Sequence, residues 1–287
     1  MLVMKYLVTG GAGFIGSHLV DALILEGHTV TVIDNMLSGS PKNMNPSAKF
    51  YNRDIRKISD IEDLFTAQDG VFHLAAIART PWCIDDPVLC YETNVMGTAN
   101  VLEASRRAGI RRVVMTSSNV VYAFMTPYRS SKEALEALGK VYTDMYGMSV
   151  VCLRNSNVYG QRQSARGPSP NVFAAIRKTI KEGGYITITG DGEQTRDFTH
   201  VSDIVNGHIM AMKSNYNGVL DLCTGVNHSL NKVAMYFDKP IQYTAERPGD
   251  VKHIIQDPRP AFDAIGWKAK VQLDDGIKDF MADVNYD

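Results

Sequence analysis

The feature that most constrains this chain is a glycine-rich segment near its start, VTGGAGFIG. A short apolar run, Lys5–Thr9, precedes the glycines and an amphipathic pattern, Phe14–Glu26, follows them, so the segment joins a predicted strand to a predicted helix. In such a turn Gly10 allows the tight bend, Gly13 lets the backbone approach a pyrophosphate, and Gly16 lets the helix pack on the strand. Because a helix N-terminus offers unpaired N–H groups to phosphate oxygens, the segment predicts a dinucleotide-binding unit.

An acidic residue completes this pattern. The next predicted strand, Thr29–Ile33, is short and rich in β-branched residues, and it ends at Asp34. A carboxylate in this place accepts hydrogen bonds from both hydroxyls of a ribose and repels a 2′-phosphate. The sequence therefore predicts NAD, and not NADP, as the cofactor.

Strand-like and helix-like patterns continue to alternate through the first half of the chain. Further buried-strand candidates are Val71–Leu74, Arg112–Thr116 and Val150–Leu153, and long helical patterns cover Val88–Ala108 and Tyr128–Gly147. Parallel strands need a crossover connection, which a helix usually provides. We therefore predict an α/β fold built on a doubly wound parallel sheet of the Rossmann type.

The amino-acid composition of the chain changes after Gly160. Residues 161–171, QRQSARGPSPN, are polar and rich in glycine, proline and serine, and the remainder mixes short strands, helices and turns. We place a domain boundary there. Residues 1–160 form the predicted NAD-binding domain, with segments near 197–223 returning to it, and residues 161–287 form a predicted smaller α+β substrate-binding domain.

Charge and composition narrow the possible partners and locations. The chain has 30 Lys and Arg against 31 Asp and Glu, a net charge of −1, which gives no reason to expect nucleic acid or an anionic membrane. Its apolar runs are shorter than the roughly 20 residues of a membrane span. The four cysteines show no metal-ligand spacing, so we expect no metal site and the reduced thiols of a cytoplasmic protein.

A tyrosine and a lysine form the chemically most informative pair in the chain. Tyr128 and Lys132 lie four residues apart in a predicted helix, so they share one face. A lysine ammonium favours the phenolate form of a neighbouring tyrosine and lowers its pKa, which makes Tyr128 a candidate general base. Upstream, Thr116, Ser117 and Ser118 end a predicted strand, and folds of this type bind ligands at the carboxyl ends of their strands.

Several longer segments follow in a recognisable order. They are TGGAGFIGSHL, then HLAA at 73–76, NVMGTANVLEA at 94–104, TSSNVVYA at 116–123, YRSSK at 128–132, RNSNVYGQRQ at 154–163, GDGEQTRDFTHVSDI at 190–204 and RPGD at 247–250. Together these segments resemble the extended short-chain dehydrogenase/reductase family. Within that family the chain is similar to the NAD-dependent sugar-nucleotide epimerases and dehydratases, most of all to UDP-glucose and UDP-N-acetylglucosamine 4-epimerases, over nearly its whole length.

The resemblance implies a role for each matching residue. Ser118, Tyr128 and Lys132 would form the catalytic triad, with Ser117 as the alternative source of the hydroxyl. The implied cofactor-binding residues are Gly10, Gly13, Phe14, Ile15, Gly16, Asp34, Asn35, Asp54, Ile55, Leu74, Ala75, Ala76, Asn94, Tyr128 and Lys132.

The same resemblance implies a set of substrate-binding residues. They would hold the diphosphate and the uridine of a UDP-sugar, and arginine suits that work because its planar fork meets phosphate oxygens two at a time. At Ile254, where the family gates the 2-substituent of the sugar, the side chain is of intermediate size, so UDP-glucose and UDP-N-acetylglucosamine both remain open. The implied residues are Asn157, Val172, Arg196, Arg247, Asp250 and Ile254.

The residues after Ser118 distinguish between the reactions of this branch. The 4,6-dehydratases carry an Asp-Glu pair there, because elimination of water needs a second acid and base. Here Asn119 and Val120 take those places, and neither can titrate. We therefore expect an isomerase that epimerises a UDP-hexose at C4 through a transient 4-keto sugar. The alternatives are a nucleotide-sugar 4,6-dehydratase or related sugar-modifying enzyme, and a non-catalytic NAD-binding sensor.

Two further expectations concern the surroundings of the site. The connection between Ser118 and Tyr128 is shorter than the family usually has, which predicts a more open site, a displaced Tyr128, or a relaxed or altered substrate. The helical patterns Val88–Ala108 and Tyr128–Gly147 resemble the pair of helices through which the family forms dimers. The resemblance therefore implies a homodimer.

Overall fold

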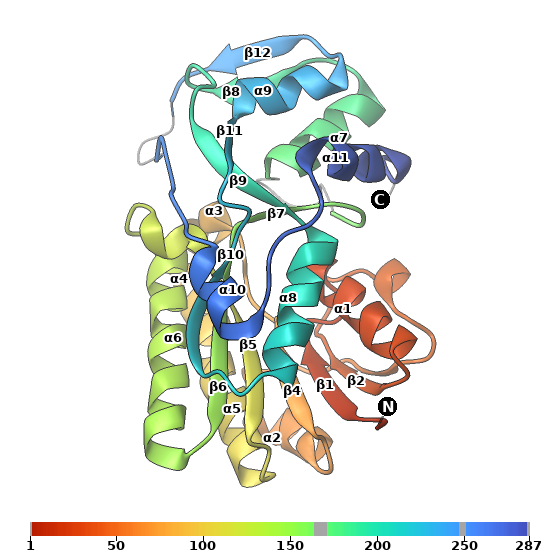
Figure 1. The fold of residues 1–287 in the computed structure, drawn as a ribbon, viewed down its shortest axis with the longest axis vertical. Coiled ribbons are helices and arrows are strands. Elements are labelled where there is room, and N and C mark those ends of the chain that lie inside the picture. The colour runs from red at the N-terminus through yellow and green to blue at the C-terminus, as the bar shows by residue number, and fades with distance from the viewer. Residues whose placement is uncertain (1, 164–170, 247–250, 286–287) are drawn as a thin grey trace.

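The computed structural model describes residues 2–163, 171–246 and 251–285. Its main element is a seven-stranded parallel sheet, with helices on both faces (Figure 1). The strand order reverses between β1 and β4, which is the switch point of a doubly wound sheet and confirms the predicted fold class. In spatial order the strands are β10 (Gly218–Leu222), β6 (Ser149–Asn155), β5 (Arg112–Ser118), β4 (Gly70–His73), β1 (Lys5–Thr9), β2 (Thr29–Ile33) and β3 (Lys49–Tyr51).

Two apolar layers hold the helices to this sheet. Leu19 of α1 and Ile204 of α8 are fully buried in the layer on one face, and Leu102 of α5 and Leu135 of α6 are buried in the layer on the other. The first face carries α1 (Phe14–Leu25), α8 (Val201–Lys213) and α10 (Arg259–Ile265), and the second carries α2 (Ile58–Ile61), α5 (Gly97–Arg107) and α6 (Pro127–Tyr146).

The predicted strands and helices of the first half agree closely with the structure, with one difference. The pattern at Val88–Ala108 predicts a single helix, but the structure has α4 (Pro87–Tyr91), a π-helical turn η3 (Glu92–Met96) and then α5. The wide turn contains Asn94, whose side chain reaches back to the backbone of Ile77. Such turns are often found at functional sites.

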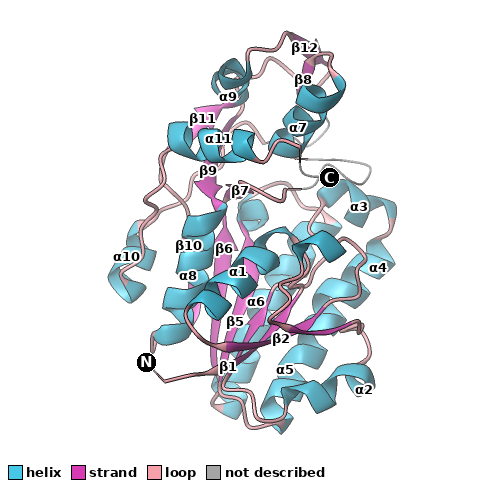
Figure 2. Cartoon of the chain, turned by 90° about the vertical axis from the view of Figure 1, so that its right-hand side faces the viewer, coloured by secondary structure: helices cyan, strands magenta, loops and turns pink. Residues whose placement is uncertain are grey.

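The remaining strands form two small sheets beyond the carboxyl edge of the main sheet (Figure 2). A cluster of aromatic rings forms their core, and Tyr159 stacks on Phe173 with ring centroids 4.6 Å apart. One sheet contains β11 (Asn227–Ser229), β9 (Thr195–His200) and β7 (Asn157–Tyr159), the other β12 (Ile241–Thr244) and β8 (Ile186–Thr189), and the helices here are α7 (Val172–Glu182), α9 (Leu230–Ala234) and α11 (Leu273–Ala282).

The chain crosses between the small sheets and the main sheet more than once. Strand β9 leads directly into α8, and β10 then joins the edge of the main sheet beside β6. The proposed boundary between residues 160 and 161 stays a prediction. The short helices that complete the described chain are η1 (Pro41–Asn43), η2 (Glu62–Phe65), α3 (Thr80–Asp85), η4 (Asn119–Tyr122) and η5 (Met235–Phe237).

Three general features bear on location and cofactors. Among the described residues, no helix combines the length and the apolar character needed to cross a bilayer. The same ranges hold no group of three or more His, Cys, Asp or Glu side chains arranged to bind a metal ion. The four cysteines are buried and free: Cys83, Cys90, Cys152 and Cys223.

Candidate active site

The glycine turn after β1 has the geometry that the sequence predicts. Gly10 has a φ of +73°, and a Cβ there would lie 2.6 Å from the backbone nitrogen of Ala75. A Cβ at Gly16 would overlap the carbonyl oxygen of Gly10. Helix α1 begins at Phe14, and its N-cap residue, Gly13, has no side chain to occupy the first N–H groups. The turn is therefore a cradle that side chains would fill, and it fits a pyrophosphate.

Asp34 is fixed beside this turn, directly after β2. Its Oδ2 accepts a hydrogen bond from the N–H of Ala12 at 3.0 Å, and its Oδ1 accepts one from the N–H of Met36 at 2.8 Å. Burial raises the pKa of the Asp34 carboxyl, and these two N–H donors oppose that rise. Each carboxylate oxygen keeps a second lone pair, so Asp34 can still accept the hydroxyls of a ribose.

Two further predicted cofactor residues lie together near Asp34. The side chain of Asn35 donates to Asp54 Oδ2 at 3.5 Å, and its own Oδ1 accepts the N–H of Leu37. The guanidinium of Arg56 binds both oxygens of Asp54 and holds the pKa of that carboxyl below its usual range. Asp54 is thus a fixed, charged acceptor. Its predicted role toward adenine stays a prediction, as does that of the adjacent, buried Ile55.

Buried polar contacts fix the loop after β4, which contains the predicted residues Leu74, Ala75 and Ala76. At its start, Thr9 Oγ1 accepts the N–H of Ala75 at 3.2 Å. At its end, Asn94 pairs with both backbone groups of Ile77, at 2.8 Å and 3.0 Å. Because the side chain of Asn94 makes both of these hydrogen bonds within the protein, it positions the loop that faces the glycine cradle.

Helix α6 and strand β5 bring the three predicted catalytic residues together. Ser118 is the last residue of β5, and its hydroxyl lies near enough to Tyr128 to lower the pKa of the phenol. Lys132 lies one turn after Tyr128, with its Nζ 5.9 Å from the centroid of the tyrosine ring. The ammonium donates to the carbonyl oxygen of Thr116 at 2.8 Å. Tyr128 and Lys132 are both buried.

Burial has the largest effect on the pKa values of these groups. It raises the pKa of the Tyr128 phenol above its ordinary value, and the neighbouring Ser118 opposes that rise. It lowers the pKa of Lys132 to about 8. The pKa of Tyr128 is therefore raised and not lowered as predicted, because removal of the phenol from water has the largest effect.

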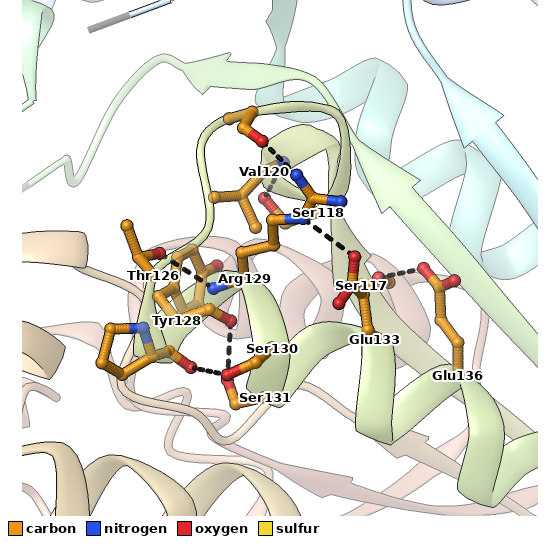
Figure 3. Close-up of polar contacts among 12 residues, drawn as sticks. Ser117, Ser118, Val120, Thr126, Tyr128, Arg129, Ser130, Ser131, Glu133 and Glu136 are labelled. Atoms are coloured by element: carbon orange, nitrogen blue, oxygen red, sulfur yellow. Dashed lines mark hydrogen bonds and ion pairs between the residues drawn. The ribbon is translucent and has the colours of Figure 1, made fainter. Parts of the chain in front are cut away.

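The structure also distinguishes between the two serines. The hydroxyl of Ser117 donates to Glu136 at 2.6 Å, on the side away from Tyr128, while the hydroxyl of Ser118 accepts the N–H of Val120 at 3.2 Å (Figure 3). Successive residues of a strand point to opposite faces. Ser118, and not the alternative Ser117, therefore faces Tyr128.

The short connection between Ser118 and Tyr128 is well ordered. Ser118 caps η4 at its start, and Thr126 caps α6 by accepting the N–H of Arg129 at 3.1 Å. The guanidinium of Arg129 then donates to the carbonyl oxygen of Ala123 and, at 2.8 Å, to Glu133 (Figure 3). These contacts span the connection from both ends and hold Tyr128 beside Ser118, while the predicted effect of the short connection on the openness of the site stays a prediction.

The predicted substrate residues come from the small sheets and their flanking segments. Asn157 on β7 donates to the carbonyl oxygen of Asp197, Arg196 on β9 donates to that of Thr195, and Val172 begins α7. Ile254 is buried, and Arg247 and Asp250 lie outside the described residues. The roles of all six residues toward a substrate stay predictions.

The polar residues that support the site were not among the predicted site residues. His73 lies between the hydroxyls of Thr9, at 2.7 Å, and Thr98, at 2.9 Å, beneath the loop after β4. Glu136 lies one turn after Lys132 on the same face of α6, and that spacing was a usable signal. Arg154 could not be found in this way, because its contact with Glu136 joins distant parts of the chain.

Comparison with known proteins agrees with this geometry. Residues 6–221 match the model of the NAD dependent epimerase/dehydratase family. The chain belongs to this family. The match confirms the resemblance seen in the sequence, and the cradle at Gly10–Gly16 together with Asp34 fits the family's cofactor, NAD.

Relatives extend the comparison to the whole chain. A putative UDP-glucose 4-epimerase of Methanocaldococcus jannaschii is 36% identical and covers 95% of both chains. The UDP-glucose 4-epimerase of Thermotoga maritima, solved with UDP-glucose, has 34% identity and a TM-score of 0.92 over 99% of this chain and 98% of its own. The UDP-N-acetylglucosamine 4-epimerase of Methanobrevibacter ruminantium has 32% identity and a TM-score of 0.91 over 100% and 98%.

Proposed function

We propose that this protein is an NAD-dependent UDP-hexose 4-epimerase, an isomerase that inverts the sugar at C4 through a transient 4-keto form. The observation that carries the proposal is the meeting of Ser118, Tyr128 and Lys132 at the carboxyl end of β5. The cradle that fits NAD lies at the carboxyl end of β1 in the same sheet. Folds of this kind bind their ligands along that edge.

Ser118, Tyr128 and Lys132 each have a distinct role in the proposed reaction. NAD, when bound, supplies the acceptor and donor of the hydride at C4. Tyr128 takes the proton of the 4-hydroxyl as the carbonyl forms and returns it as the alcohol forms again on the other face of the sugar. Ser118, which lies beside Tyr128, holds the same oxygen in line. Lys132 supplies the cation that favours the phenolate whenever Tyr128 has given up its proton.

The surroundings of Ser118 favour epimerisation over dehydration. Elimination of water from the sugar requires an additional acid and base beside the hydroxyl residue. The residues in that place are Asn119, which is buried, and Val120, and neither side chain transfers protons. A 4,6-dehydratase would release a stable keto sugar, and a non-catalytic NAD sensor would release no product, so product analysis separates both from an epimerase.

We also infer that two copies of the chain associate through α4, η3 and α6. Apolar side chains are exposed along these elements, and several line a shallow hollow between them. Exposed apolar patches of this kind are typical of interaction surfaces. The exposed residues are Val88, Tyr91, Met96, Val141, Met145 and Tyr146. The four free thiols favour a reducing compartment such as the cytoplasm.

Product analysis with a matched pair of tyrosine variants tests the proposed function. The purified protein, with its bound NAD, is incubated with UDP-glucose and with UDP-N-acetylglucosamine, and the products are identified by ¹H NMR. We expect interconversion with the C4 epimer for at least one sugar, and a loss of about 10²-fold or more in Tyr128→Phe, because general acid–base catalysis contributes that much.

The control is Tyr142→Phe, which removes a phenol from the same helix whose hydroxyl contacts Glu103 instead of the site. This variant is expected to keep the activity of the unmodified protein. Full activity in Tyr128→Phe, or a stable keto product from the unmodified protein, would rule out the proposed mechanism.

A further inference from the structure

A buried ion pair lies behind the catalytic residues. Glu136 is on α6, four residues after Lys132, and its two carboxylate oxygens accept hydrogen bonds from Arg154 at 2.8 Å and 2.7 Å. One of these oxygens also accepts the hydroxyl of Ser117 at 2.6 Å. The side chain of Glu136 is only 11% exposed and that of Arg154 25%, so this bidentate pair is largely removed from water. Such pairs are strongly directional.

The same arginine reaches the turn that follows Ser118. Its Nη1 donates to the hydroxyl of Tyr122 at 2.6 Å, and its guanidinium lies 5.1 Å from the centroid of that ring. Tyr122 is the last residue of η4 and donates in turn to Asp221 on β10 at 3.0 Å. Arg154 itself is on β6, whose register places it directly beside Ser117 on β5.

These contacts enclose Ser118 from both sides. The residue before it, Ser117, is bound to Glu136, and the turn after it is bound through Tyr122 to Arg154. Glu136 in turn belongs to the helix that carries Tyr128 and Lys132. The ion pair is thus the point where the strand, the turn and the helix of the catalytic triad are joined.

We propose that Glu136 and Arg154 are positioning residues that hold Ser118 against Tyr128 and keep a negative charge behind Lys132. The proposal rests on the proposed epimerase function, since it names what sets the geometry of that site. Neither residue touches the sugar or the cofactor in this scheme, and both act through Ser117, Tyr122 and α6.

The charge of Glu136 has a definite direction of effect. Burial lowers the pKa of Lys132, and the neighbouring carboxylate of Glu136 raises it again in part. The ion pair of Glu136 and Arg154 also faces the carboxyl of Asp221 on β10. The titratable groups that face Lys132 are Tyr128 and Glu136 on α6, Cys83 on α3, Cys90 on α4, Cys152 on β6 and His73 on β4.

The first test replaces Glu136 by Gln in the NAD-bound protein. This change keeps the size of the side chain but removes the charge and one half of the bidentate pair. We expect kcat to fall about 10- to 100-fold with an unchanged KM for the UDP-sugar, because small misplacements of catalytic groups cost that much. We also expect the alkaline limb of the pH profile to move to lower pH, since Lys132 loses its proton more easily without the carboxylate.

A second variant distinguishes the effect of the geometry that the ion pair holds from the effect of the Glu136 charge on Lys132. Arg154→Lys keeps the cation but loses the planar fork that binds Glu136 and Tyr122 together. We expect kcat to fall as in Glu136→Gln, while the alkaline limb stays in place. The control is Glu182→Gln, which removes one partner of an exposed ion pair with Lys178 on α7 and is expected to leave both quantities unchanged.

Two results would overturn the proposal. One is a Glu136→Gln protein with lower thermal stability but unchanged kcat and pH profile, which is the result for a purely structural ion pair. The other is a crystal structure of Arg154→Lys in which Ser118 and Tyr128 keep the relative position that they have in the unmodified protein. The crystal structure needs no turnover, so it decides the question even if the unmodified protein converts no UDP-sugar and the proposed function itself fails.

Discussion

Burial and polar contacts together fix the side chains around this site. Burial also changes their pKa values, as His73 shows. Its ring is fully enclosed between Thr9 and Thr98, and burial lowers its pKa to about 3. Lys132, also buried, adds to this lowering. The imidazole is therefore neutral in the folded protein over the whole physiological range. In that form it supports the loop that follows β4.

Acid should weaken the fold through this residue. In the unfolded chain the imidazole binds a proton below about pH 6.5, whereas in the folded protein it does so only near pH 3. The contribution of His73 is thus complete above pH 6.5. It is lost as the pH falls toward 3, by about 1.4 kcal/mol for each pH unit. Urea denaturation at pH 7 and pH 4.5 measures it, with His73→Gln as the comparison.

A His73→Gln protein is expected to be less stable at pH 7 and to lose less stability on acidification. His208, whose pKa burial lowers to about 4, remains in that variant and accounts for part of the dependence that is left. An equal loss of stability in the two proteins would contradict the assignment of this pH dependence to His73.

At the scale of elements, the sequence predicted those helices and strands that form through contacts between residues close together in the chain. Strand β1, helix α1 and strand β2 match their predicted ranges closely because apolar periodicity and the glycine turn lie within a short stretch of chain. The π-helical turn around Asn94 was not predictable, since it follows from a contact with Ile77, seventeen residues earlier. The pairing of β7 with β9 likewise depends on residues distant in sequence.

The glycine turn gives a prediction at this scale. Gly16→Ala places a methyl group against the carbonyl oxygen of Gly10, with no flexible neighbour to move away. We expect a loss of stability of about 1–3 kcal/mol from overpacking, and protein that is purified with little or no NAD. Heat release of the cofactor followed by chromatography measures the NAD content.

Gly27→Ala is the matched control for this change. Gly27 has a φ of +84°, so alanine is strained there by roughly 1 kcal/mol, but no atom lies within 4 Å of the added Cβ. This variant is expected to keep its NAD. If Gly16→Ala also keeps its full NAD content, the glycine turn is not where this protein binds NAD.

At the scale of the whole molecule, the chain passes several times across one edge of the main sheet. It leaves after β6, returns through α8, leaves again after β10 and comes back at α10 (Figure 1). The sequence predicted a change of character near residue 160 and a return of segments near 197–223, but not the later return at α10. That return depends on which apolar faces pack together, here α10 on the layer that holds α1 and α8. The spacing of Tyr128 and Lys132 and the family resemblance predicted the candidate catalytic residues, whereas the ion pair behind them was not predictable.

In the proposed mechanism a hydride leaves C4 of the sugar and returns to the same carbon. A UDP-hexose that carries deuterium at C4, incubated with the protein in ordinary water, tests this step. We expect the epimeric product to keep its deuterium at C4, as seen by mass spectrometry and ¹H NMR, because the hydride never exchanges with solvent. Replacement of that deuterium by hydrogen from water would rule out the mechanism.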